Sequence, residues 1–469
     1  MNKSLKNNLD KNPDIEKFEL FESAIDTFIL EIDALAESLP LIGGLLVYKL
    51  KSSSKLLDQF VKKKSKNEDD EEKEEFQISI EQFNEFNRLD RDYEIAKAAM
   101  DILPRHFIVS LVSQYDAYLA ELYRTLFQIK PELAFSLDKT FTFQEILKYE
   151  NLNILKENLI EKDVENLLRE SHFEQLKVLE KRITKHLGKD FTLTTNLPIL
   201  STFIEVAERR NLFVHCNGIV STQYLDVCKK HKVYDIDKIK LNDVLDVSPK
   251  YFEKAYRAYY EIGVKLSQVL WRKFLPDKIV EADKNLNNIC YDLLYSGYYE
   301  LAKTLLKFAT EELPKNGNQA DRKIFVVNKA LAFYLSGDKD TTIRILDAED
   351  FTIGKEFKLA VAVLKDDFEL AKNLMIKIGD EDEVFSKESY QEFPLFKIFR
   401  ETDEFKYAFK KVFKEDFIIR EAPKKSFIKM LDSINQKKKE VVTKEKQKTA
   451  KKVISKAELS KIKKSDRRK

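Results

Sequence analysis

The sequence predicts an all-α protein, and two observations support this prediction. The chain of 469 residues contains only 10 glycines and 10 prolines, the residues that most often interrupt helices. Leu, Ile, Lys, Glu and Phe are abundant, and apolar residues recur at helical spacing through most of the chain. A chain of this length exceeds what one hydrophobic core usually organises, so we expect two or three domains.

Residues 1–75 are predicted to form a helical extension followed by a charged linker. Apolar side chains recur at helical spacing from Phe18 to Ile32. The longest apolar run, residues 39–48, is about half the length needed to span a bilayer, so we expect a buried helix or turn there. Residues 62–75 carry a basic block and then an acidic one, which predicts a solvated linker or a helix extension.

Residues 76–275 are predicted to form a helical domain. A strong helix is expected from Phe107 to Phe127, with Pro104 near its start, where proline is tolerated. Its apolar stripe consists of Ile108, Leu111, Tyr115, Tyr118 and Leu122. Further helices are expected at 151–187, 198–215 and 251–274, with a connector at 188–197 and a turn at 218–221.

Residues 277–420 are predicted to form an antiparallel array of helical hairpins. Turns are expected at Gly297, Gly337 and Asp366, at spacings scattered around a period of roughly 34 residues. With Tyr299, Ala302, Leu306, Ala309 and Pro314 at the expected offsets, the first unit resembles a tetratricopeptide repeat, and later units are degenerate. The alternative is three helical hairpins without repeat kinship. Either arrangement offers a concave surface for a protein partner.

Residues 421–469 are Lys-rich and are expected to be disordered or to form a lone helix. The basic side chains suit sequence-independent attraction to RNA phosphates, and the candidate contacts are Lys437, Lys438 and Lys439. The alternative is a solubilising tail without a dedicated ligand.

Several classes of chemistry find no support in the sequence. No glycine-rich phosphate-binding motif and no cluster with metal-ligand spacing occurs, so we expect neither a cofactor nor a metal. The cysteines, Cys216, Cys228 and Cys290, form no CxxC pair and predict a reducing, cytoplasmic setting. The polar opening residues predict no signal peptide.

The most informative segment is Arg-Asn-Leu-Phe-Val-His at residues 210–215, near the end of a predicted helix. Asn211 and His215 are four residues apart and share one strip of that helix, beside which Arg210 lies. Arg209 lies further round the helix and is expected to be an exposed cation that contacts RNA. The face expected to be buried carries Phe203, Ala207 and Val214.

Arg210, Asn211 and His215 suit the cleavage of RNA without a metal. An imidazole can remove a proton from the 2′-hydroxyl or protonate the 5′ leaving oxygen. A guanidinium stays charged and can bond two phosphate oxygens at once, and the amide can orient the phosphate or the imidazole. The structural alternative is that Arg210 pairs with Glu205, Glu208 or a distant carboxylate.

The arrangement Arg-polar-x-x-x-His at the end of a helix resembles the HEPN superfamily. The wider segment 208–221, with Ser-Leu-Val-Ser-Gln-Tyr-Asp-Ala at 110–117, extends the resemblance over about residues 80–275. The resemblance implies a helical bundle that forms a homodimer through the motif helices, with one composite cleft. It also implies a further polar group on an earlier helix, for which Asp116 is the candidate, the alternative being an exposed carboxylate.

Three functions remain open at this point. The first is a cytoplasmic, metal-independent endoribonuclease that leaves 2′,3′-cyclic phosphate ends, in the toxin or antiviral setting that the resemblance implies. The second is a non-catalytic dimerisation or RNA-binding module whose helical array binds a partner. The third is a membrane-surface protein that uses residues 39–50 and the basic tail.

Overall fold

The computed structural model describes residues 17–64, 79–136, 142–188, 191–314, 316–352, 354–380 and 384–418. Within these ranges the regular structure is helical, and the one β feature is an isolated antiparallel bridge between Ile219 and Val244. The prediction of an all-α fold is therefore confirmed. Lys437, Lys438 and Lys439 lie outside the described residues.

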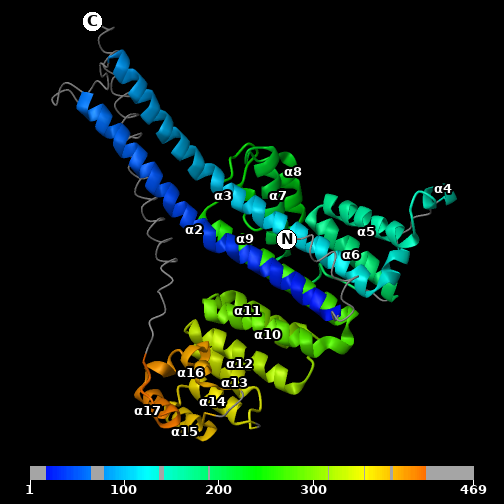
Figure 1. The fold of residues 1–469 in the computed structure, drawn as a ribbon, viewed down its shortest axis with the longest axis vertical. Helices are drawn as coiled ribbons and strands as arrows, with labels where there is room; N and C mark the ends of the chain where they lie inside the picture. Colours follow the sequence, from blue (N-terminus) through cyan, green and yellow to red (C-terminus); the bar gives the residue numbers. More distant parts are fainter. Residues whose placement is uncertain are drawn as a thin grey trace. The chain divides into compact units, whose positions relative to one another are not determined.

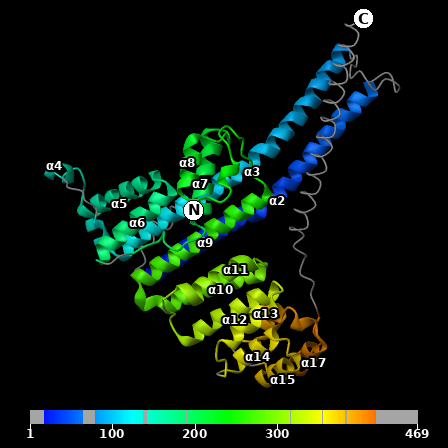
Figure 2. The same cartoon turned by 180° about the vertical axis from the view of Figure 1, so that it is seen from behind.

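Sixteen α-helices follow one another along the described parts of the chain (Figures 1 and 2). The first eight are α2 (Lys17–Lys64), α3 (Ile80–Ile129), α4 (Phe143–Ile146), α5 (Leu152–Arg169), α6 (His172–Leu187), α7 (Leu200–His215), α8 (Thr222–Lys230) and α9 (Pro249–Phe274). The others are α10 (Ile279–Ser296), α11 (Tyr299–Lys307), α12 (Gln319–Leu335), α13 (Lys339–Asp347), α14 (Lys355–Leu364), α15 (Phe368–Ile378), α16 (Lys387–Glu392) and α17 (Asp403–Phe413).

The described chain divides into two compact units. The first unit draws on residues 17–32, 109–245 and 254–418, and the second on 33–64, 79–108 and 246–253. Each of the long helices α2, α3 and α9 contributes to both units. The predicted segment boundaries near 75, 275 and 421 stay predictions.

Aromatic packing between α2, α3 and α9 forms the centre of the first unit. Phe28 stacks on Tyr118 with ring centroids 4.3 Å apart, and Phe21 stacks on Trp271 at 5.8 Å. Gly263 on α9 is required here, because a Cβ at this position would lie 2.3 Å from Cε1 of Phe28. The Tyr118 hydroxyl also donates a hydrogen bond of 2.9 Å to the Gly263 carbonyl.

The predicted helical hairpins of the C-terminal region are present. The hairpins α10–α11, α12–α13 and α14–α15 turn at Gly297, Gly337 and Asp366, which take φ values of 83°, 90° and 59°. Successive helices contact one another, as do α10 with α12 and α12 with α14. These contacts make the region an antiparallel helical array, whereas kinship to tetratricopeptide repeats stays a prediction.

Two local expectations were wrong. Pro104 lies inside α3, because that helix already begins at Ile80 and accommodates the proline in its interior. The apolar run at residues 39–48 is helical but not buried, because Leu41, Leu45 and Tyr48 of α2 face solvent. No helix of the described ranges is long and apolar enough to cross a membrane.

Candidate functional site

The motif helix α7 spans Leu200–His215, close to the predicted range. The chain reverses just beyond it, where Asn217 and Gly218 take φ values of 50° and 80°. The Gly218 N–H donates to the Leu212 carbonyl at 3.0 Å, and the Leu212 side chain packs in a small core with Tyr224. These contacts fix the C-terminal end of α7, which carries the predicted site.

The guanidinium of Arg210 is held by Asp116 on α3. Nη2 of Arg210 lies 3.3 Å from Oδ2 of Asp116, and both side chains are 24% exposed. Asp116 is therefore a paired, part-buried carboxylate and not an exposed one. The pair joins positions 94 residues apart, which local sequence patterns do not specify.

His172, the first residue of α6, lies on the other side of Asp116. Its Nε2 atom is 3.3 Å from Oδ1 of Asp116, although the approach does not make a well-aligned hydrogen bond. The imidazole is buried, with ring centroids 5.6 Å from Tyr115 and 5.3 Å from Phe203. His172 is not among the residues predicted for the site, because nothing in its local sequence relates it to α3 or α7.

Two buried tyrosines line the apolar side of this cluster. The rings of Tyr115 and Tyr259 are 5.4 Å apart, and among the described residues neither hydroxyl has a hydrogen-bond partner. Burial raises the pKa of both phenols well above the ordinary value, and the nearby charge of Asp116 adds to the effect. Both tyrosines therefore stay neutral and act as packing residues.

The Asn211 side chain donates a hydrogen bond to Glu208, a buried carboxylate of the same helix. Burial raises the pKa of Glu208, while the charge of His172, a hydrogen bond from Asn211 and the charge of Arg210 oppose this shift. The Asn211 amide thus stabilises a neighbouring carboxylate in the described chain. Its predicted role in orienting a phosphate requires that hydrogen bond to be exchanged.

The expectation that Arg209 is an exposed cation was wrong. Its side chain is 12% exposed, and Nε donates to Oε1 of the buried Glu205 at 2.7 Å. The Tyr224 hydroxyl donates to the same oxygen at 2.7 Å. Burial, reinforced by the Glu205 charge, also raises the pKa of Cys228 to about 12, so this thiol stays protonated. Arg209, Glu205 and Tyr224 thus form a hydrogen-bonded network that joins this side of α7 to α8.

His215 is the last residue of α7, and it is exposed. In the described part of the chain its side chain makes no hydrogen bond or ion pair. Val214 is 50% exposed, so its expected place on the buried face was wrong. Phe203 and Ala207 are buried as predicted, whereas in the last turn of the helix Leu212 is buried on another side and Val214 is left uncovered. That turn therefore presents an imidazole and an apolar side chain to solvent.

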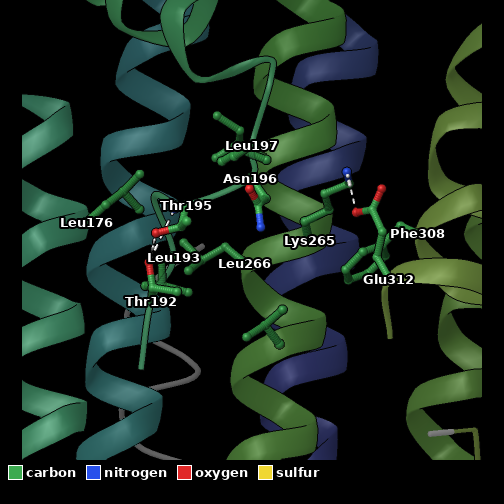
Figure 3. A pocket seen from close by; sticks show the side chains of 12 residues that line it. Leu176, Thr192, Leu193, Thr195, Asn196, Leu197, Lys265, Leu266, Phe308 and Glu312 are labelled. Atoms are coloured by element: carbon green, nitrogen blue, oxygen red, sulfur yellow. Dashed lines mark hydrogen bonds and ion pairs between the residues drawn. The ribbon is translucent and has the colours of Figure 1, made fainter. Parts of the chain in front are cut away.

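A small cavity of about 130 Å³ lies between the connector after α6, helix α9 and the segment Phe308–Glu312 that follows α11 (Figure 3). Asn196 and Lys265 approach it, and Lys265 forms ion pairs with Glu261 at 3.0 Å and Glu312 at 3.2 Å. None of the predicted site residues lines this cavity.

Glu180 anchors the connector that forms one wall of the cavity. Its Oε1 atom accepts hydrogen bonds from the backbone N–H groups of Leu193 at 2.6 Å and Thr194 at 2.7 Å. Burial by itself raises the pKa of Glu180, but these bonds and those from the side chains of Lys177, Thr194 and Thr192 outweigh it and lower the pKa to about 2.

The described residues contain no group of three His, Cys, Asp or Glu side chains placed to hold a metal ion. No protein-family model matches the chain, and no curated protein and no solved structure matches it. The resemblance to the HEPN superfamily stays a prediction from the sequence motif.

Proposed function

We propose that this protein is a metal-independent endoribonuclease of the HEPN type. The observation that carries the proposal is the fixed guanidinium of Arg210, which Asp116 holds while about a quarter of the side chain faces solvent. A pre-positioned guanidinium with an open edge can accept a phosphate without first being ordered. The negative charge that develops on the phosphate oxygens during cleavage is stabilised in this way.

His215 supplies the proton transfer in this proposal. It follows Arg210 by five residues, which corresponds to about 7.5 Å along a helix. An exposed imidazole at this distance suits a phosphate held by Arg210 while it deprotonates the 2′-hydroxyl or protonates the 5′ oxygen. The expected products carry a 2′,3′-cyclic phosphate and a 5′-hydroxyl.

One helix provides one imidazole, whereas cleavage requires both a base and an acid. Pairing of two copies through the ends of α7 supplies a second His215. The exposed Val214 beside it gives this end of the helix an apolar contact to bury on pairing. We therefore place the active form in a homodimer, in a toxin or antiviral role.

One observation favours the second candidate, a non-catalytic RNA-binding or dimerisation module. Arg209 and Arg210 are both paired with carboxylates, so the described motif helix carries little uncompensated positive charge for a phosphate. In this case the helical array would bind the partner. A groove of about 700 Å³ between α11, α12 and α13 is lined by the cations Lys303, Lys307, Arg322, Lys329 and Arg344 and the anions Glu300, Glu311 and Glu349.

The two candidates differ in what they do to single-stranded RNA in the presence of EDTA. The full chain should cleave the RNA, whereas His215→Ala and Arg210→Ala should lose at least about a hundredfold in rate. His106→Ala, which removes an exposed histidine of α3, serves as the matched control and should retain the wild-type rate. An RNA with 2′-deoxy positions should stay intact.

Intact RNA at high protein concentration, combined with RNA binding that Arg210→Ala weakens, would establish the binding module instead. Equal cleavage by His215→Ala and the wild type would refute the assigned chemistry.

A further inference from the structure

Helix α2 carries an exposed apolar stripe within the second unit. Leu41, Leu45 and Tyr48 are 56%, 70% and 74% exposed. Their spacing of four and then three residues places them on one side of the helix, as in a helix that pairs with another helix. Three large apolar side chains in adjacent turns form a continuous surface, unlike the scattered exposed residues of ordinary surfaces.

An adjacent side of α2 is already occupied within the unit. Ser53 and Phe60 are buried, and Phe60 packs on Phe86 of α3 with ring centroids 6.1 Å apart. At about 100° per residue, Ser53 and Phe60 lie roughly 80–120° round the helix from the apolar stripe. The two helices also run side by side in both views (Figures 1 and 2). The contact with α3 therefore leaves the stripe uncovered, as the exposure of its three side chains shows.

The charged residues before and after the stripe differ in sign. Glu37 precedes it, while Lys51 and Lys55 follow it, and all three side chains are exposed. Lys51 and Lys55 lie 14 and 18 residues after Glu37, close to four and five whole turns, so the three charges share one flank of the stripe. Next to the stripe this flank is therefore acidic on the N-terminal side and basic on the C-terminal side, and the exposed Asp58 follows beyond the lysines.

We propose that α2 pairs with α2 of a second copy of this chain, antiparallel and centred on Leu45. In this register Leu45 meets its own counterpart on the two-fold axis, and Leu41 meets Tyr48. The same flanks of the two helices face each other, so Glu37 of each copy lies between Lys51 and Lys55 of the other.

Parallel pairing would instead set this charged flank of each helix against the opposite flank of the other copy, so Glu37 would not meet Lys51 and Lys55. A lipid surface would attract the lysines but gain nothing from the acidic end. The charge order thus selects an antiparallel second copy as the occupant. This interface is separate from the pairing through α7, and it does not depend on RNA cleavage.

The test is a local disulfide in the full chain. Leu45→Cys is introduced with Cys216→Ser, which removes the exposed native thiol. Mild oxidation should produce a covalent dimer, because the new thiols lie at the centre of the interface. Tyr234→Cys in the same background, at a residue that is 81% exposed in the first unit, is the matched control and should link far less.

Charge exchange then tests the register. Adding Glu37→Lys should lower the cross-linking rate about tenfold, because the like charges occur twice by symmetry. Adding Lys51→Glu and Lys55→Glu to that variant should restore it. Far-UV circular dichroism confirms that each variant keeps its helical content.

The proposal is overturned if the folded Leu45→Cys protein forms no covalent dimer. It is also overturned if Glu37→Lys leaves the rate of cross-linking unchanged. Sedimentation of uncross-linked protein with phosphatidylserine vesicles, abolished by Leu45→Glu, would assign the stripe to a lipid surface and overturn it as well.

Discussion

Asp116→Asn is the most direct test of the cluster around Arg210. The change keeps the shape of the side chain and removes the charge that faces Arg210 at 3.3 Å and His172 at 3.3 Å. An exposed ion pair contributes about 0–1 kcal/mol, whereas breaking a buried pair costs about 3–5 kcal/mol. With both partners 24% exposed, the pair lies between these limits, and we expect a loss of about 2 kcal/mol.

Urea unfolding followed by tryptophan fluorescence measures this loss in the relevant unit. Trp271 is the single tryptophan, and it is buried against Phe21 in the first unit. A double-mutant cycle with Arg210→Gln should give a coupling of about 1 kcal/mol, which is a factor of about 5 in the equilibrium constant.

Glu121→Gln provides the matched control, because this α3 carboxylate is 54% exposed and pairs with Arg124 at 3.6 Å. This substitution should lower the free energy of unfolding by less than about 0.5 kcal/mol. Strictly additive effects of Asp116→Asn and Arg210→Gln would refute the idea that Asp116 holds Arg210.

Three further predictions concern the parts of the fold that support the site. Glu205→Gln should lower the free energy of unfolding in urea by about 3 kcal/mol, since it removes a buried charge that faces the part-buried Arg209 at 2.7 Å, and an effect below about 1 kcal/mol would show the pair to be dispensable. Folding lowers the pKa of Glu180 from 4.5 to about 2, so its carboxylate stabilises the protein above pH 4.5 and loses this effect as the pH falls toward 2. Glu180→Gln should therefore lower the free energy of unfolding by about 2–3 kcal/mol at pH 7 and make that free energy depend less on pH below pH 4.5. If the free energy of unfolding varied with pH as in the wild type, Glu180 would not be the group responsible. Gly263→Ala should lower the thermal midpoint markedly because its Cβ meets Phe28, whereas Gly43→Ala, with open space around it, should leave it unchanged or raise it.

The helical class and the course of the main helices follow from the sequence pattern. Apolar spacing places α7 and α9 within a few residues of their observed ends, and the turns at Gly297 and Gly337 separate the hairpins of the array. These features are local, because helical periodicity and positive-φ turn residues act over a few neighbours.

The partner of Arg210 depended on long-range packing, whereas that of Arg209 lies one turn away on the same helix. Arg209 and Arg210 are adjacent, yet one faces Glu205 of its own helix and the other Asp116, since successive side chains point about 100° apart. His172 joined the cluster because α6 packs beside α3 and α7, which no local pattern specifies. The exposure of Val214 and of the α2 stripe likewise reflects where a core ends. Periodicity shows which side of a helix is apolar, and the packing of distant helices determines whether that side is covered.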